Sequence, residues 1–269
     1  MALPARTAPP RRGRLSVRQA VALGLIQGPA ELLPVSSSGH LVLVPAVLDW
    51  PYARLPADIR KAFEVALHTG AGLALVWLLR DDAVAAIKDP ARTARLAAPA
   101  AVVALALEPT IEKRLSSPNV AATAQIAAGA ALAASNHIPK HGVPGWLREF
   151  LVGLAQIAAL VPGVSRNGAT LTAARAVGLD REASARMSWQ AGLPIIGGAT
   201  VLKLVRLSQS GLDQELRTPF AAGAAAAFAS TLVAAPLLRV RRQRWVGAYR
   251  IVFGALALRR LHRLEWPRG

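Results

Sequence analysis

The sequence GLIQGPAELLPVSSSGH occupies residues 24–40 and interrupts a chain that is otherwise rich in apolar residues. A second interruption, GLAQIAALVPGVSRNGAT, occupies residues 153–170. Both stretches combine proline and glycine, which break helices, with glutamine, serine or arginine. In a membrane, a broken helix occurs only where protein or a water-filled cavity surrounds it. These two stretches therefore decide the expected fold and the expected site.

Around the interruptions, the chain carries long runs that lack Asp, Glu, Lys and Arg. These runs are residues 32–48, 65–79, 96–107, 115–139, 150–165, 187–202 and 218–238. A helix that crosses a bilayer needs about 20 mostly apolar residues, and some of the runs reach that length. A soluble chain of 269 residues cannot build a core large enough for so many apolar helices. The pattern predicts an all-α polytopic membrane protein, with one integral membrane domain over residues 1–269.

The composition excludes several classes of protein. The chain is 53% hydrophobic and 17% charged, whereas a soluble domain has about 25% charged residues. It has no cysteine, which excludes a disulfide scaffold, a thiolate metal site and a cysteine nucleophile. The net charge is +17, and arginines gather between the apolar runs, as is typical of interfacial anchoring. No basic stripe is interleaved with aromatic residues, so no nucleic-acid partner is expected.

The two interruptions match each other at an offset of 129 residues. The matched pairs are Gly24 and Gly153, Leu25 and Leu154, Gln27 and Gln156, Val35 and Val164, Ser36 and Ser165, and Gly39 and Gly168. Chance matching in a chain of low complexity is the alternative, but the glutamine pair and the V-S-x-x-G pair favour an internal duplication. The expected repeats cover roughly residues 16–135 and 146–261. Duplicated membrane proteins often place such broken helices face to face near the midplane.

The polar residues of the interruptions suit an anionic ligand. Serine, glycine and backbone N–H groups at a helix start form a cradle for phosphate, and Arg166 supplies a planar clamp for oxyanions. Glu31 supplies a carboxylate for a divalent cation or for proton transfer. His40 titrates near neutrality and is a candidate acid or base, while Ser37 is a candidate nucleophile or phosphate ligand. Together these are the parts of phosphoryl transfer.

At these residues the sequence resembles the undecaprenyl-diphosphate phosphatase family, also called the bacitracin-resistance proteins. The family pattern is an (E/Q)-x-x-x-E element that runs into P-V-S-S-[ST]-G-H, followed later by P-G-x-S-R-S-x-x-T. Here the first part reads QGPAE at residues 27–31 and PVSSSGH at residues 34–40, and the second reads PGVSRNGAT at residues 162–170. Phe63-Glu64-Val65 is similar to a third family segment. The resemblance covers essentially the whole chain.

The resemblance implies a fold of six membrane spans plus two re-entrant helix-loop-helix elements in an inverted repeat. It implies hydrolysis of a C55 polyprenyl diphosphate to the monophosphate and inorganic phosphate, which recycles the lipid carrier for cell-wall polymers such as peptidoglycan. It also implies a divalent cation, Mg²⁺ or Ca²⁺. The expected location is the bacterial plasma membrane, with the site open to the outer face. The membrane-embedded chain is expected to bind the polyprenyl diphosphate lipid, and a homodimer is left open.

Site residues follow from the positions that match the family motifs. The implied catalytic set is Glu31, Ser37, His40 and Arg166. The expected phosphate-binding residues are Gln27, Ser36, Ser38, Ser165, Asn167 and Thr170, and the expected metal ligands are Glu31 and Gln27. Two positions depart from the usual pattern. Gln27 replaces a glutamate, so one negative charge near the cation is lost, and Asn167 replaces a serine that follows the arginine.

Several alternatives stay open at the level of sequence. The nucleophile is either Ser37 or a water molecule. Glu64 is either a carboxylate of the site or a charge at the end of a span, and His68 either reaches the site or bonds a neighbouring helix. The rival function is a polyprenyl-phosphate transporter, or flippase, that lacks efficient hydrolysis, because paired re-entrant loops in an inverted repeat are also transporter architecture. A non-catalytic membrane scaffold is a third hypothesis.

Overall fold

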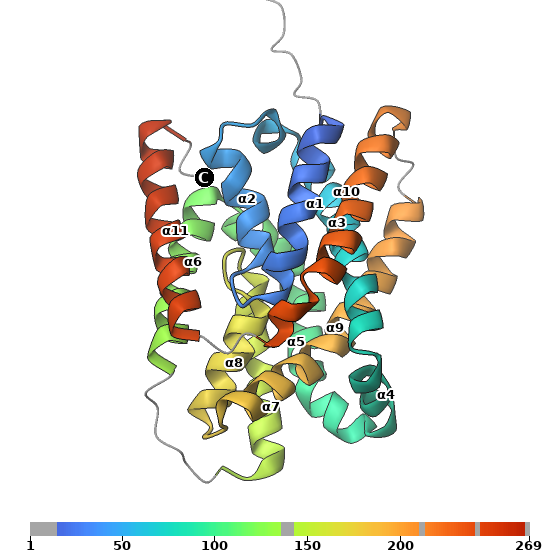
Figure 1. The fold of residues 1–269 in the computed structure, drawn as a ribbon, viewed down its shortest axis with the longest axis vertical. Coiled ribbons are helices and arrows are strands. Elements are labelled where there is room, and N and C mark those ends of the chain that lie inside the picture. Colours follow the sequence, from blue (N-terminus) through green and yellow to red (C-terminus); the bar gives the residue numbers. More distant parts are fainter. Residues whose placement is uncertain (1–14, 136–142, 210–212, 240–242, 267–269) are drawn as a thin grey trace, which may run out of the picture.

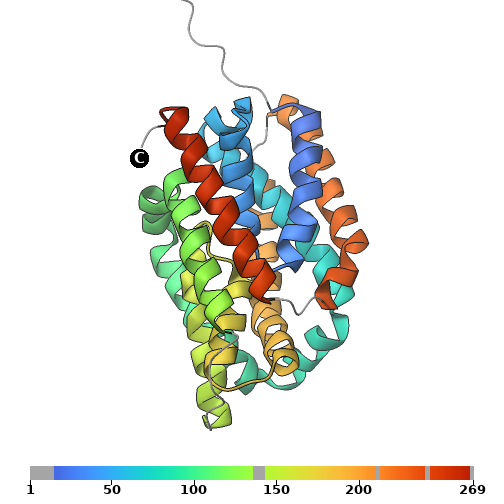
Figure 2. The ribbon, with the colours of Figure 1, turned by 60° about the vertical axis from the view of Figure 1, so that its left-hand side comes forward.

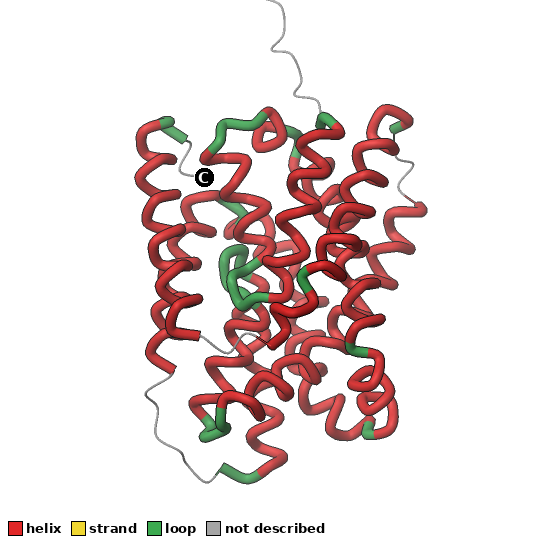
Figure 3. Tube along the Cα trace, in the orientation of Figure 1, coloured by secondary structure: helices red, strands yellow, loops and turns green. Residues whose placement is uncertain are grey.

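The computed structural model of the chain describes residues 15–135, 143–209, 213–239 and 243–266. The expected single domain 1–269 and the end of the apolar run 115–139 therefore extend beyond the described residues. Within the described ranges every regular element is a helix, and the remaining segments are loops (Figure 3). The predicted all-α class is confirmed.

The helices follow one another along the chain with short connections. Up to residue 135 they are α1 (Val17–Leu32), α2 (Ser37–Val47), η1 (Pro51–Arg54), α3 (Ala57–Leu78), α4 (Arg80–Lys88), α5 (Pro90–Leu115) and α6 (Pro118–Ala134). From residue 143 they are α7 (Gly145–Ala155), η3 (Gln156–Leu160), α8 (Arg166–Ala176), α9 (Arg181–Gln209), α10 (Gln214–Val233), η4 (Ala235–Arg239) and α11 (Gln243–Arg263).

Two elements of the bundle are broken by a loop: the first is α1, its loop and α2, and the second is α7, η3, their loop and α8. Pairs of longer helices surround them. Helix α11 packs along α6 on one side of the molecule, and α1 packs along α10 on the other, as Figures 1 and 2 both show. Helix α3 contacts α10 and α9, while α5 contacts α7 and α9. The loops that precede α2 and α8 lie between these pairs, inside the bundle, where Figure 3 draws them as loop segments. The expected site residues lie on these inner loops.

Small residues allow helix α10 to approach its neighbours closely. A Cβ atom added to Gly24 of α1 would lie 2.4 Å from the carbonyl oxygen of Gly223, and one added to Gly70 of α3 would lie 2.1 Å from that of Ala224. Side chains at these positions would push the helices apart. The abundance of glycine and alanine in the sequence thus serves close helix packing, as is common between membrane helices.

The two broken elements have the same register. Helix α2 begins at Ser37 and helix α8 at Arg166, and each has 11 residues. These starting positions differ by 129 residues, which is the offset that the sequence comparison predicted. A duplication over the expected repeat boundaries stays a prediction, but the match between the two helices extends from their first residue to their last.

The same residue type begins both helices. The hydroxyl of Ser36 accepts a hydrogen bond from the backbone N–H of Gly39 at 3.2 Å, and that of Ser165 accepts one from Gly168 at 3.1 Å. Such N-caps satisfy a donor that the first helical turn leaves unpaired. The preceding loops bend differently, because the positive φ angle falls on Ser36 itself (71°) in the first loop and on Gly163 (95°) in the second.

No individual helix of the described residues has both the length and the apolarity of a membrane span, whereas α3 and α4 meet both conditions as a pair that bends by 79°. This result does not define the number of membrane spans or the re-entrant elements. The expected arrangement of six spans and two re-entrant elements therefore stays a prediction.

Candidate active site

A cavity of about 380 Å³ opens where the two broken elements meet. Helices α3, α5 and α9 complete its walls. Its polar lining includes Glu31, Ser36, Ser37, Ser38, Glu64, His68, Ser165, Arg166 and Asn167. Its apolar lining includes Ala100, Ala101, Ala104, Ile195, Ile196 and Ala199. Polar side chains come from the two inner loops and from α3, and this part of the cavity is its polar end, whereas α5 and α9 contribute mostly apolar side chains.

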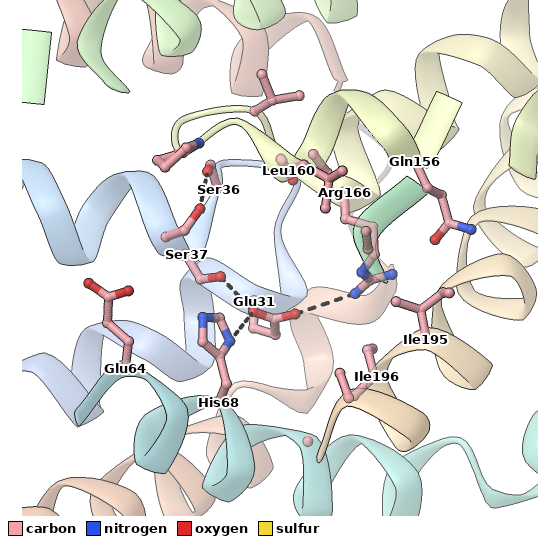
Figure 4. Close-up of a pocket in the computed structure, with 18 of the residues that line it drawn as sticks. Glu31, Ser36, Ser37, Glu64, His68, Gln156, Leu160, Arg166, Ile195 and Ile196 are labelled. Carbon is pink, nitrogen blue, oxygen red and sulfur yellow. Dashed lines mark hydrogen bonds and ion pairs between the residues drawn. The ribbon is translucent and has the colours of Figure 1, made fainter. Parts of the chain in front are cut away.

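Glu31 lies at the centre of the polar end (Figure 4). Its Oε2 accepts a hydrogen bond from the hydroxyl of Ser37 at 2.6 Å, and its Oε1 accepts one from Nη2 of Arg166 at 3.3 Å. Nδ1 of His68 lies 3.6 Å from Oε2. The carboxylate is only 13% exposed, and the guanidinium of Arg166 reduces the cost of burying its charge. Residues from both halves of the chain thus converge on one carboxylate.

Ser37 and Arg166 are the first residues of α2 and α8, so the N-terminal ends of both helices adjoin the cavity. The free N–H groups and the partial positive charge of a helix N-terminus favour an anion. Arg166 adds a full positive charge beside them. The polar end of the cavity is therefore suited to phosphate oxygens.

Four of the expected phosphate-binding residues line the cavity, namely Ser36, Ser38, Ser165 and Asn167. The hydroxyl oxygens of Ser36 and Ser38 lie 3.3 Å apart. Asn167 donates from Nδ2 to the carbonyl oxygen of Leu32 at 3.1 Å, and its Oδ1 accepts from the hydroxyl of Ser188 at 2.7 Å. Asn167 therefore also joins the two halves of the chain.

Gln27 and Thr170 do not line the cavity. Gln27 is fully buried behind Glu31, and its Nε2 lies 3.0 Å from Nδ1 of His68 and 3.3 Å from Oε2 of Glu31. Thr170 is fully buried against α9, where its hydroxyl lies 2.6 Å from that of Ser188. Both positions are one helical turn away from a residue that does reach the cavity. Their expected phosphate contacts therefore have no support from the geometry.

His40 is also absent from the cavity lining. Its Nδ1 lies 2.8 Å from the carbonyl oxygen of Ser36, and its Nε2 lies 2.7 Å from the hydroxyl of Tyr249 on α11. Its ring stacks on Phe253, with ring centroids 4.6 Å apart. Both ring nitrogens thus already have partners, a backbone carbonyl oxygen and a hydroxyl group on α11. The structure brings Glu31, Ser37 and Arg166 together but directs His40 toward α11, and its expected role in proton transfer stays a prediction.

Sequence reasoning assigned no role to two further residues of this region. Gly192 of α9 packs against Arg166, because a Cβ atom there would lie only 1.7 Å from Nη1. Gln156 lines the cavity, and its buried Oε1 has no hydrogen-bond partner among the described residues. The match with Gln27 was the one available signal for Gln156. Gly192 lies in an apolar run, where nothing distinguishes it from a glycine that serves helix packing.

The residues of the site do not fit a preformed divalent-cation site. Across the part of the chain that the structure describes, no group of three or more His, Asp or Glu side chains is placed to hold a metal ion. Both oxygens of Glu31 already accept hydrogen bonds, and Gln27 directs its Nε2 toward Glu31. The expected cation stays a prediction.

Comparison with a family model and comparison with curated proteins both point to the same family. The family model described as bacitracin resistance protein BacA matches residues 20–256. A protein of Trichlorobacter lovleyi named undecaprenyl-diphosphatase is 38% identical over 232 residues, covering 78% of this chain and 83% of its own. A protein of Geobacter sulfurreducens with the same name is 36% identical over 255 residues, covering 86% and 91%. One of Geotalea daltonii, also so named, is 36% identical over 272 residues, covering 89% and 96%.

The matched region contains both broken elements and every residue of the candidate site. It extends from α1 into α11 and so includes helices from both halves of the bundle. This chain belongs to the bacitracin resistance protein BacA family.

Proposed function

We propose that this chain hydrolyses undecaprenyl diphosphate to undecaprenyl phosphate and inorganic phosphate. The observation that carries the proposal is the Glu31 carboxylate, held between the Ser37 hydroxyl of one half and the Arg166 guanidinium of the other inside a cavity. The names of the relatives support this substrate. The lining of the cavity supports it too, because a diphosphate suits the polar end and a prenyl chain suits the apolar side chains of α5 and α9.

Different residues bind the diphosphate, accept the proton and hold the prenyl tail. Arg166 and the N-terminal ends of α2 and α8 bind the diphosphate and stabilise the charge that develops on its oxygens. Glu31 accepts a proton from the nucleophile, since a carboxylate within hydrogen-bond reach is a suitable general base. Arg166 orients Glu31 through the hydrogen bond from its Nη2 to Oε1. The apolar walls formed by α5 and α9 hold the first part of the prenyl tail.

Ser37 is the nucleophile that the geometry favours, because its hydroxyl already donates to Glu31 at 2.6 Å. In this mechanism Oγ of Ser37 forms a bond to the terminal phosphorus while the bridging P–O bond breaks. The Ser37 proton passes to Glu31, which gives it to the undecaprenyl phosphate as that group leaves. The Glu31 carboxylate then takes a proton from the water that attacks the phosphoserine and returns it to Oγ of Ser37 as the bond from Ser37 to phosphorus breaks and inorganic phosphate leaves. Direct attack by water is the alternative.

We place the site within a membrane, in the family arrangement of six spans and two re-entrant elements, with the cavity open to the outer face of the plasma membrane. Large apolar side chains on the outside of α5 and α9 support contact with lipid. Val102 is 65% exposed, Leu105 is 71% exposed and Val201 is 64% exposed. The chain has no cysteine. A single cysteine at Ser116, which lines the cavity, would therefore report the orientation through labelling with an impermeant maleimide.

The direct test is phosphate release from undecaprenyl diphosphate by the purified protein in detergent. The proposal expects turnover by the wild-type protein and a trapped phosphoenzyme after rapid acid quenching. With Ser37→Ala it expects no phosphoenzyme and a large fall in turnover, to the residual rate of direct attack by water. Thr123→Ala is the control, since its exposed hydroxyl donates to the carbonyl oxygen of Asn119 on α6 and does not line the cavity. A wild-type protein that moves polyprenyl phosphate across liposomes but releases no phosphate would contradict hydrolysis and establish the transporter hypothesis.

A further inference from the structure

Helix α11 carries an arginine that the proposed reaction does not use. Arg250 is fully buried, although it bears a positive charge. Its Nη1 donates to the carbonyl oxygen of Pro34 at 3.0 Å, its Nη2 to that of Gly163 at 2.7 Å, and its Nε to Oε1 of Gln125 at 2.9 Å. Burial of a charged group is tolerated when its donors are satisfied. Here all three nitrogens are engaged by oxygen atoms from three separate segments.

Two of these acceptors occupy matching positions in the two broken elements. Pro34 precedes Ser37 by three residues, and Gly163 precedes Arg166 by three residues. At the offset of 129 residues, Pro34 and Gly163 coincide. A single guanidinium therefore holds the equivalent carbonyl groups of both inner loops. Its rigid, forked geometry sets the separation of the two loops.

Gln125 of α6 extends the same contact. Its Nε2 donates to the carbonyl oxygen of Val35 at 2.7 Å, while its Oε1 accepts from Arg250. The loops around this pair are tightly packed, since a Cβ atom on Gly39 would lie 3.0 Å from Cα of Gly163. The α6–α11 pair thus holds the first loop at two successive carbonyl groups and the second loop at one.

We infer that Arg250, supported by Gln125, is a positioning residue that sets the distance between Ser37 and Arg166 across Glu31. This inference rests on the proposed hydrolysis. Because reacting groups tolerate little displacement, a shift of one loop by about 1 Å is expected to slow the reaction up to 100-fold. Lysine cannot replace arginine here, since one ammonium group cannot reach carbonyl groups on both loops with the same geometry.

The test measures kcat and KM for phosphate release in detergent, together with thermal unfolding, for Arg250→Lys and Gln125→Met. For Arg250→Lys we expect kcat to fall by about 10- to 100-fold and KM to change less than threefold, because Arg166 still binds phosphate. For Gln125→Met we expect the same pattern with a smaller fall. The matched control is Arg260→Lys on the same helix, whose exposed side chain makes one long contact to Val47.

The outcomes separate the inference from the proposed function. If the wild-type protein releases no phosphate, the proposed function fails. If the wild-type protein is active and Gln125→Met keeps the wild-type kcat, the positioning role is wrong, whether or not Arg250→Lys folds. A parallel loss of activity and folded protein, with unchanged kcat per folded molecule, would also overturn it. A lower kcat in folded protein with unchanged KM supports it.

Discussion

The first broken element, α1 to α2, and the second, α7 to α8, share their register and the length of their second helix but not their chemistry. Each leads through a short loop into an 11-residue helix with a serine N-cap. At matching positions, however, the first carries Glu31 and Ser37 where the second carries Leu160 and Arg166. The carboxylate of Glu31 and the hydroxyl of Ser37 thus come from the first half of the chain, and the guanidinium of Arg166 comes from the second.

This difference explains how two helices of the same length and matching register, α2 and α8, form an asymmetrical site. If both halves carried a carboxylate at the position of Glu31, two negative charges would face a negative substrate. Leu160 instead adds an apolar surface to the cavity wall. The shared positions supply backbone geometry and helix ends, whereas the positions that differ supply the base, the nucleophile and the phosphate clamp.

The largest effect is expected from removing the acid of the first element. Glu31→Gln should lower kcat/KM by about 1000-fold, because it removes the general base and the partner of Arg166. Phosphate release in detergent measures the change. Glu182→Gln, at an exposed residue paired with Arg186, is the control and should retain full activity. Activity of Glu31→Gln within threefold of the wild type would exclude Glu31 as the base.

A second prediction concerns the space that α9 leaves for Arg166 of the second element. Gly192→Ala should lower kcat/KM by roughly 10- to 100-fold, because the added methyl group displaces the guanidinium from Glu31. Gly198→Ala on the same helix is the matched control, since a Cβ atom there meets no neighbour within 4 Å. Equal activity of the two variants would show that Arg166 does not need its observed position.

The two matched glutamines offer a third comparison. Gln27→Glu places a second carboxylate near Glu31, whose Oε2 lies 3.3 Å from Nε2 of Gln27. Like charges repel, so we expect about tenfold lower activity in the presence of a chelator and a stronger response to added Mg²⁺ or Ca²⁺. Gln156→Glu, at the matching position, is the comparison variant. Faster hydrolysis by Gln27→Glu in the chelator would instead show that the native glutamine limits the site.

The smallest effect is expected at Asn167, which joins the two elements through Leu32. Asn167→Ala leaves the carbonyl oxygen of Leu32 without this donor. The free energy of unfolding in detergent should therefore fall by about 1–2 kcal/mol. Activity should fall only a few-fold. Thr123→Ala, which removes an exposed hydroxyl bond to Asn119, controls for loss of a single hydrogen bond. An unchanged stability would mean that Asn167 contributes nothing to joining the elements.

The sequence was sufficient to predict the helical class, the two broken elements and their register. It also predicted that Glu31, Ser37 and Arg166 meet, because the two interruptions match each other and duplicated membrane proteins often place such broken helices face to face. The orientation of His40 could not be predicted, since it depends on Tyr249 and Phe253 on a helix more than 200 residues away.

The roles of Gly192, Arg250 and Gln125 could not be predicted from the sequence, because they depend on packing between residues far apart in the chain. Gly192 lies in an ordinary apolar run, and its role depends on the path of Arg166. Arg250 follows the basic residues that precede α11 and is easily grouped with them. A usable signal for Arg250 was its position within the residues 245–258, which contain no other charged side chain. Gln125 offered a similar signal as a polar residue in an alanine-rich helix.

A double-mutant cycle between Ser37 and Arg166 tests most directly whether the two elements act on one carboxylate. The variants are Ser37→Ala, Arg166→Lys and the combination, and the measurement is kcat/KM for phosphate release from undecaprenyl diphosphate. If both residues act through Glu31, the double variant will be little slower than the slower single variant, with a coupling energy above about 1 kcal/mol. Losses that simply multiply would show that the two elements act independently and would contradict a shared site.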